Sequence, residues 1–134
     1  MIAVDTSVIM AMALREPEAE RFSSLVRQEP AVIGWPTLLE TRMVLTGRGF
    51  ANAAAIIAQL VALPNVTAIA FDERHYQAAE KAFDQFGKGR HPAGLNMGDC
   101  FSYAVAAVAK APLLFKGNDF GRTDVKCHPA SSTQ

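Results

Sequence analysis

The sequence lacks the features of a metal-stapled, disulfide-stapled or membrane protein. Its 134 residues include only two cysteines, Cys100 and Cys127, which lie far apart, and three isolated histidines. A zinc site needs thiols or imidazoles in close pairs, so we expect both cysteines to be reduced thiols of a cytosolic protein. No apolar run reaches the roughly 20 residues of a membrane span. We therefore expect a cytoplasmic protein without a membrane association.

The sequence also lacks net charge. Thirteen lysines and arginines balance thirteen aspartates and glutamates, so the strongly basic composition of many nucleic-acid-binding proteins is absent, although a local basic patch is compatible with this balance. Half of the residues are hydrophobic, and a chain of this length buries enough apolar surface to need no staple. The length predicts one domain over residues 1–128, followed by a frayed tail over residues 129–134.

Short apolar runs alternate with helical segments along the chain. Strands are predicted at residues 2–4, 31–35, 66–71 and 112–116, with a short fifth at 125–127. Helices are predicted at residues 8–14, 18–28, 37–46, 51–63, 73–86 and about 98–110. Apolar strands without alternation, separated by helices, favour a parallel sheet that is covered on both faces. The predicted fold class is α/β, a three-layer α/β/α domain with a central parallel sheet of four or five strands.

Four acids fall at places where they could meet. Ligands of open parallel sheets bind beyond the carboxyl ends of the strands. Asp5 follows the first strand, Glu40 lies early in the helix after the second, and Asp119 lies in the loop after the fourth. Asp99 begins the helix that leads into the fourth strand, so strand position alone does not place it. Taken singly, each acid is explained as a helix cap, a helix-dipole partner, a turn residue or a solvated charge.

Taken together, the four acids predict metal chemistry. Carboxylates that converge at one sheet edge repel one another and raise one another's pKa. A hard divalent cation relieves this repulsion, and Mg²⁺ and Mn²⁺ prefer carboxylate and water ligands. One or two such ions can activate a water and stabilise phosphate oxygens during displacement. Four acids without a histidine cluster therefore indicate metal-assisted phosphodiester chemistry.

Four segments, spread in order from residue 2 to about residue 125, carry a family resemblance. They are IAVDTSVIMAMALREPEAERF, PTLLETRMVL, LNMGDCFSYAVAAV and PLLFKGNDFGRTDV. The DTS sequence alone is weak evidence for a family, but its combination with the other three segments is specific to one family. In these segments the chain resembles the PIN-domain ribonucleases, and in particular the VapC-type toxins of toxin–antitoxin pairs.

This resemblance implies an endoribonuclease that depends on Mg²⁺ or Mn²⁺ and cleaves an RNA such as tRNA or rRNA. Asp5 and Asp99 would be the main metal ligands. Glu40 would complete the acidic site, directly or through water, and help to activate the nucleophilic water. Asp119 would place a second metal or a bridging water. Gly117 stands where some relatives have another acid.

The resemblance also implies further contacts and partners. Thr6 or Ser7 is similar to the small hydroxyl residue that the family places beside its first aspartate. A homodimer and a VapB-type antitoxin protein are the implied protein partners. Basic residues in two loops are candidates for RNA contact: Lys88, Arg90, Lys116 and Arg122. The aromatic residues Trp35 and Phe120 are expected to pack in the core rather than to stack on a base.

Three other interpretations compete with the nuclease. A catalytically inert PIN-like module would bind a partner and leave the acids unused. A receiver-like phosphoacceptor domain would use Asp5, Asp72 and Lys116, all of which follow strands, but it needs paired acids after the first strand. A phosphatase of the haloacid-dehalogenase type needs a second aspartate where Ser7 stands. The receiver-like interpretation also gives no role to Glu40 or Asp99.

Overall fold

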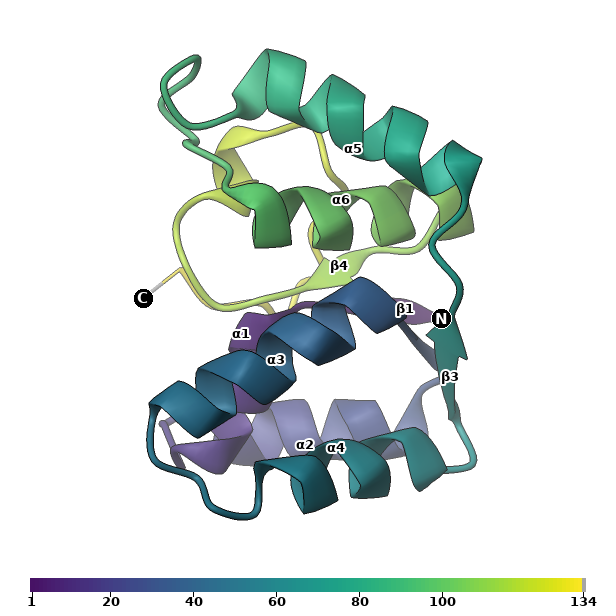
Figure 1. Cartoon of the computed structure of the whole chain (residues 1–134), viewed down its shortest axis with the longest axis vertical. Helices are drawn as coiled ribbons and strands as arrows, with labels where there is room; N and C mark the ends of the chain where they lie inside the picture. The colour runs from purple at the N-terminus through teal and green to yellow at the C-terminus, as the bar shows by residue number, and fades with distance from the viewer. Residues whose placement is uncertain (134) are drawn as a thin grey trace.

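The structure is a computed structural model, and it describes residues 1–133. None of the helices in this part of the chain combines the length and the apolarity that are needed to cross a bilayer. The elements follow one another as labelled in Figure 1: β1 (Ile2–Val4), α1 (Thr6–Ala13), α2 (Ala19–Gln28), β2 (Ala31–Gly34), α3 (Trp35–Gly47), α4 (Ala53–Ala62), β3 (Val66–Ile69), α5 (Glu73–Phe86), α6 (Met97–Ala109), β4 (Leu113–Leu114) and the 3-10 helix η1 (Phe120–Arg122).

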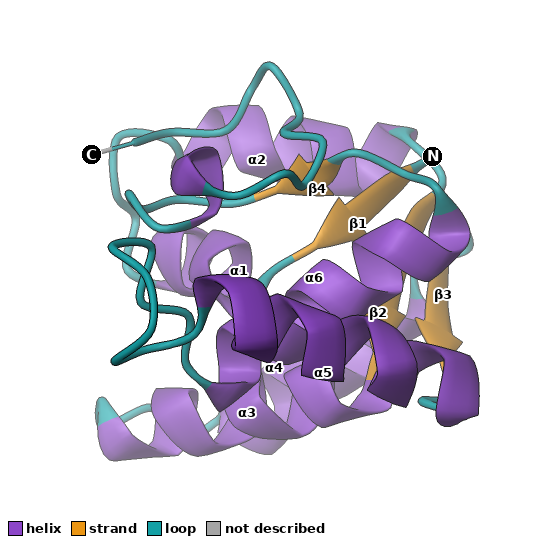
Figure 2. Cartoon of the chain, turned by 90° about the horizontal axis from the view of Figure 1, so that it is seen from above, coloured by secondary structure: helices purple, strands orange, loops and turns teal. Residues whose placement is uncertain are grey.

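The strands of residues 1–133 form a parallel sheet in the order β3-β2-β1-β4. Helices α1, α2 and α4 contribute to an apolar core on one face, and α5 and α6 contribute to a second core on the other. Figure 2 shows β1 and β4 between α2 on one side and α5 and α6 on the other. The predicted three-layer α/β/α fold is confirmed. Because all the strands run in the same direction, their carboxyl ends share one edge of the sheet.

The residues of the strands explain why both faces of the sheet carry helices. On β1, Ile2 and Val4 belong to the core beside α1, α2 and α4, whereas Ala3 belongs to the core beside α5 and α6. On β2, Ile33 belongs to the core beside α1, α2 and α4, and Val32 belongs to the core beside α5 and α6. Successive side chains of a strand point to opposite faces, so a strand that is apolar at every position is buried on both.

One predicted core residue lies elsewhere. Trp35 begins α3 and is 53% exposed, so the prediction that it packs in the core is wrong. The strand before it ends at Gly34, because Pro36 in the first turn of α3 has a φ angle suited to a helix start. Phe120 is only 4% exposed and belongs to the core beside α5 and α6, as predicted.

The end of the chain lies along β4. In place of a fifth strand at residues 125–127, Cys127 makes a single parallel bridge to Leu113. A frayed tail is predicted over residues 129–134, yet the described part of this segment is hydrogen-bonded. The Ser132 N–H donates to the carbonyl of Phe115 at 3.0 Å. An edge strand exposes unpaired backbone groups, and these contacts satisfy some of them on β4.

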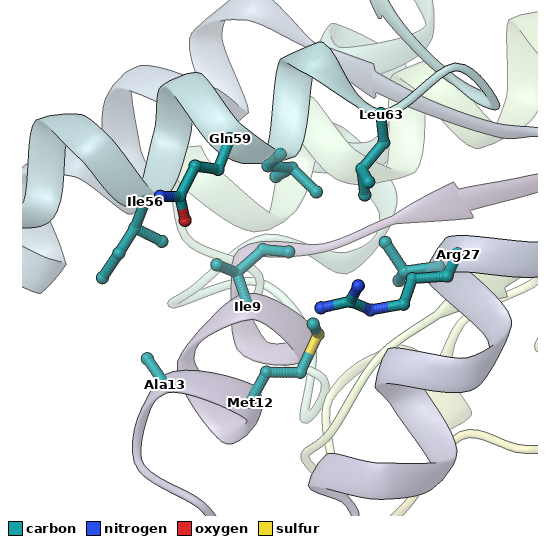
Figure 3. Close-up of a pocket in the computed structure, with 9 residues that line it drawn as sticks. Ile9, Met12, Ala13, Arg27, Ile56, Gln59 and Leu63 are labelled. Atoms are coloured by element: carbon teal, nitrogen blue, oxygen red, sulfur yellow. The ribbon is translucent and has the colours of Figure 1, made fainter.

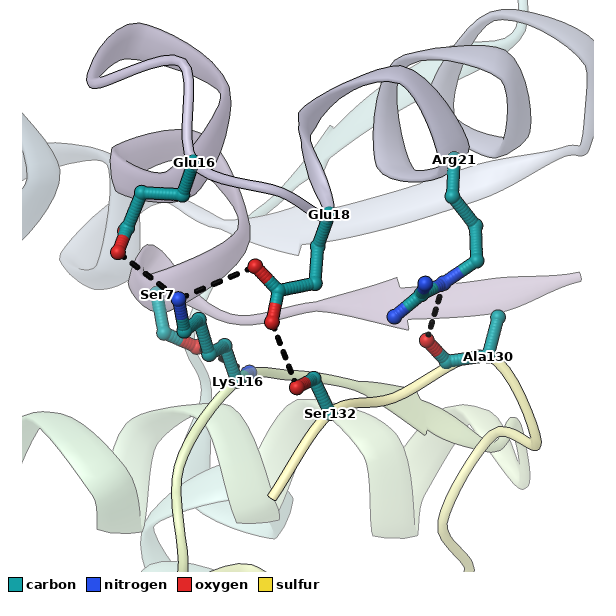
Figure 4. A network of polar contacts seen from close by, with 7 residues as sticks. All are labelled: Ser7, Glu16, Glu18, Arg21, Lys116, Ala130 and Ser132. Atoms are coloured by element: carbon teal, nitrogen blue, oxygen red, sulfur yellow. Dashed lines mark hydrogen bonds and ion pairs between the residues drawn. The ribbon is translucent and has the colours of Figure 1, made fainter. Parts of the chain in front are cut away.

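Side chains also hold the end of the chain (Figure 4). The Lys116 ammonium group lies 2.8 Å from a carboxylate oxygen of Glu16 and 3.1 Å from one of Glu18. The Ser132 hydroxyl donates to the other oxygen of Glu18 at 2.7 Å. The hydrogen bonds from Ser132 and Lys116 hold the pKa of the Glu18 carboxyl at about 2. This network joins the loop before α2, the loop after β4 and the end of the chain.

Candidate active site

Asp5 is the first residue after β1 and the N-cap of α1. Its Oδ2 atom accepts hydrogen bonds from the N–H of Ser7 at 3.0 Å and from the Ser7 hydroxyl at 2.6 Å. Its Oδ1 atom accepts one from the Ser102 hydroxyl of α6 at 2.5 Å. The N–H of Lys116 donates to the Ser7 hydroxyl at 2.9 Å, which ties this cap to the end of β4. Asp5 is therefore a helix cap and also a buried carboxylate with a fixed orientation.

Glu40 extends from α3 toward the start of α1. The Thr6 hydroxyl donates to Glu40 Oε1 at 2.6 Å, and the Thr6 oxygen also lies 2.9 Å from the Thr41 hydroxyl. The sequence left open which of the two hydroxyls after Asp5 serves the acids. Both do: Ser7 binds Asp5, whereas Thr6 binds the carboxylate that comes from α3.

Asp99 lies in the first turn of α6, where a capping box holds it. The N–H of Asp99 donates to Asn96 Oδ1 at 2.9 Å, and Asp99 Oδ2 accepts from the N–H of Asn96 at 3.1 Å. The carboxylate is therefore fixed against the start of α6. Burial, with the charge of Asp99, raises the pKa of the neighbouring Cys100 thiol to about 11, so this cysteine stays protonated at neutral pH.

Asp99 and Glu40 are affected by burial and by the charges of the other acids. Burial raises the pKa of the Asp99 carboxyl to about 7, and the negative charges of Asp5, Asp119 and Glu40 contribute to the rise. Burial also raises the pKa of Glu40, with a further contribution from Asp5 and against the effect of the Thr6 hydrogen bond. The structure therefore brings the four predicted acids into one electrostatic cluster. Asp119 is its exposed member, in the turn before η1.

The acids suit a divalent cation in their chemistry. Across residues 1–133, no three His, Cys, Asp or Glu side chains are already arranged as a set of metal ligands. Three of the acids, Asp5, Glu40 and Asp99, accept hydrogen bonds from protein groups, but a carboxylate has about four lone-pair sites and retains capacity for a metal. Burial and the nearby negative charges raise the pKa of Asp99, and a bound cation would offset the repulsion between these charges. The residues therefore fit Mg²⁺ or Mn²⁺ after rearrangement of side chains.

The basic residues predicted to contact RNA are placed differently from one another. Lys116 is paired with two glutamates, and the Arg90 guanidinium lies over the Phe83 ring at 4.7 Å. Arg122 donates to a loop carbonyl at 3.4 Å, and Lys88 is exposed. Their contact with RNA stays a prediction.

Asp72, which the receiver-like interpretation needs, has a structural role. It is the N-cap of α5, and its carboxylate accepts hydrogen bonds from the N–H of Arg74 at 2.9 Å and from the Arg74 guanidinium at 3.1 Å. The hydrogen bonds from Arg74 lower its pKa to about 2. Since Asp72 caps a helix and Lys116 pairs with two glutamates, only Asp5 remains of the three residues that a receiver-like site would use.

Two residues of α6 contact the acids in ways that the sequence did not predict. Ser102 is 2% exposed and binds Asp5, and its spacing of three residues from Asp99 on an apolar helix was the available signal. Gly98 lies against the Glu40 carboxylate, and a Cβ atom at this position would collide with Glu40 Oε2. No local sequence signal reveals that contact, because it depends on how α3 packs beside α6.

Comparison with known proteins agrees with this architecture. A family model described as "PIN domain" matches residues 2–126. The chain therefore belongs to the PIN-domain family. Its similarity is to the VapC branch of that family: the chain is 38% identical over 125 residues to Ribonuclease VapC30 of Mycobacterium tuberculosis, a match that covers 92% of this chain and 95% of the relative.

Solved structures share the fold at lower sequence identity. The Mycobacterium tuberculosis toxin VapC20, described as cleaving the sarcin-ricin loop, superposes with a TM-score of 0.74 at 18% identity, over 93% of this chain and 96% of that one. A chain of a toxin–antitoxin complex from Klebsiella pneumoniae superposes with a TM-score of 0.70 at 13% identity, over 98% of this chain and 99% of that one.

The raised pKa of Asp99 predicts a pH-dependent stability. Between about pH 4 and 7 the folded chain holds a proton that the unfolded chain releases, so metal-free stability should fall as pH rises through this window. The Asp99→Asn variant mimics the protonated form. Its free energy of unfolding should equal that of the wild type near pH 4 and exceed it by about 2 kcal/mol near pH 8. This free energy is about half of what the pKa shift of Asp99 would give in full, because Asp99 is partly open to solvent and solvent screens its charge.

The measurement is urea unfolding of both proteins in a chelator across this range. The exposed Asp84→Asn variant of α5 is the matched control, which should follow the wild-type profile. Identical pH profiles for Asp99→Asn and the wild type would contradict the electrostatic cluster.

Proposed function

We propose that this chain is a metal-dependent endoribonuclease that acts in the cytoplasm as the toxin of a VapBC-type pair, with tRNA or rRNA as its substrate. The observation that carries the proposal is the convergence of Asp5, Glu40, Asp99 and Asp119 at the carboxyl edge of the sheet, where they form one electrostatic cluster. The identity with VapC ribonucleases over most of the chain supports the same interpretation.

The residues of the site have distinct roles in this proposal. Asp5 and Asp99 would hold the divalent cation, with Glu40 and Asp119 completing the site directly or through water. A bound Mg²⁺ or Mn²⁺ would lower the pKa of a coordinated water and stabilise the charge on the phosphate oxygens. Glu40, which has a raised pKa and accepts a hydrogen bond from Thr6, would accept a proton from the attacking water.

The surrounding hydrogen bonds keep the acids in place while a phosphodiester is bound. The Ser7 and Ser102 hydroxyls each hold one oxygen of Asp5, and the N–H of Asn96 holds one oxygen of Asp99. Such partners of metal ligands orient them and tune their basicity. In the free protein the same donors offset part of the cost of burying carboxylates.

A groove between α1, α2 and α4 is a candidate site for the antitoxin. It encloses about 360 Å³, and its apolar lining includes Ile9, Met12 and Leu63. Figure 3 shows the Arg27 side chain reaching between these residues. Apolar walls with one cation suit an amphipathic helix that carries an acid, so we propose that a VapB-type antitoxin docks here.

An apolar face on α3, α5 and the start of α6 is a candidate homodimer interface. Its exposed large side chains are Trp35, Leu39, Met43, Val44, Tyr76, Phe83 and Met97. A hollow of about 750 Å³ lies among several of them and is also lined by Glu40 and Gly98. Exposed apolar patches of this kind mark interaction sites. A second copy bound at this face would lie next to the acids.

Metal-dependent RNA cleavage is the first expected outcome. Purified wild-type protein without antitoxin should cleave total tRNA or rRNA at discrete sites with Mg²⁺ and not with EDTA. Asp99→Asn should lower the rate by on the order of 100-fold or more, because a metal ligand is lost, whereas Asp84→Asn should retain wild-type activity. Product ends mapped by primer extension provide the measurement. Absence of cleavage of any RNA, together with normal partner binding, would favour the inert module.

Blocking the groove should prevent neutralisation by the antitoxin. Gln59 is exposed and lines the groove, so Gln59→Trp should fill it and leave RNA cleavage intact in the presence of the cognate antitoxin. The neighbouring Ala58→Trp, exposed on the same helix, is the matched control and should stay inhibited. The measurement is cleavage rate against antitoxin concentration. Full inhibition of the Gln59→Trp variant would place the antitoxin elsewhere.

A charge on the apolar face should break the dimer. Met43 is 64% exposed, so Met43→Glu should shift sedimentation from a dimer to a monomer without loss of folding, because a desolvated charge opposes association. Gln28→Glu adds the same charge at the end of α2 and should leave the dimer unchanged. A monomeric wild type, or a dimeric Met43→Glu variant, would refute this interface.

A further inference from the structure

Gly98 occupies a place where a side chain would collide with Glu40 in its present position. A Cβ atom at this position would collide with the Oε2 and Cδ atoms of Glu40 and would lie 2.8 Å from Oε1. These three atoms are its nearest neighbours, and all belong to the carboxylate of one side chain. The carboxylate of Glu40 therefore rests in the space that the missing side chain of Gly98 leaves.

The backbone does not explain a glycine at this position. Gly98 lies in the first turn of α6 and is absent from the glycines with positive φ. Glycine is a poor helix former, so another residue would favour the helix itself. Gly47, which lies in α3, differs from Gly98, because a Cβ atom there would meet no other atom within 4 Å. The close approach of a carboxylate thus distinguishes Gly98.

We infer that Gly98 is a positioning residue, which lets the Glu40 carboxylate lie against the start of α6 beside Asp99. Thr6 holds Oε1 from the side of α1, and Gly98 admits Oε2 on the side of α6. The positive end of a helix dipole favours a carboxylate at such a place. This inference rests on the proposed metal-dependent function, because the position of Glu40 matters for a site that all the acids complete together.

The test is Gly98→Ala, measured by Mn²⁺ binding in electron paramagnetic resonance rather than by activity alone. The added methyl collides with the far end of a flexible side chain, so the variant should fold while the Glu40 carboxylate moves. Mn²⁺ affinity should fall about tenfold, as is typical when the support of a metal site is removed. Gly47→Ala is the matched helical control and should keep wild-type affinity. A crystal structure of Gly98→Ala should show the Thr6–Glu40 hydrogen bond lost.

A double-mutant cycle separates this role from a general defect. In a Glu40→Ala background the methyl has no carboxylate to displace, so Gly98→Ala should cause no further loss of Mn²⁺ affinity. Unchanged affinity of Gly98→Ala, or equal losses in both backgrounds, would overturn the inference. If Gly98→Ala does not fold alone, it should fold in the Glu40→Ala background, and failure there also overturns it. A wild type that binds no Mn²⁺ would overturn the proposed metal site, and the inference with it.

Discussion

The gathering of partly buried acids at one sheet edge is the constraint on which the rest of this structure depends. Burial raises the pKa of Asp99, and the charges of Asp5 and Glu40, which come from different elements, add to the rise. The protein stabilises this arrangement with donors from helix starts: Ser7 for Asp5, and Asn96 for Asp99. The caps that begin α1 and α6 are therefore also the supports of the site. Helix initiation and site assembly use the same hydrogen bonds.

The sheet order makes this convergence possible. β1 lies between β2 and β4, so the segments that follow three neighbouring strands meet around Asp5. The side chains of β1 and β2 are apolar and buried on both faces of the sheet, which leaves the carboxyl edge for charged residues. Lys116 adds to the stability of that edge, because its backbone N–H donates to the Ser7 hydroxyl and its ammonium group binds two glutamates.

Much of this could be predicted, and the exceptions have physical causes. Strands that are apolar at every position indicated the buried parallel sheet, and an acid directly after a strand indicated Asp5. Asp99 precedes a strand, so its place beside Asp5 followed only from the family resemblance. The exposure of Trp35 could not be predicted, since an apolar residue beside a buried strand has the same local pattern whether it faces the core or a partner. The contacts of Gly98 depend on the packing of two helices, which no local pattern encodes.

The pairing of β1 with β4 has a consequence for the timing of synthesis. Asp5 is made well before its neighbour β4 and the Lys116 loop, which lie more than 100 residues later in the chain. A growing chain on the ribosome can therefore form the first helices but cannot complete the acidic cluster until Asp119 has emerged. The acidic cluster can therefore form only after the helices between β1 and β4 have been made.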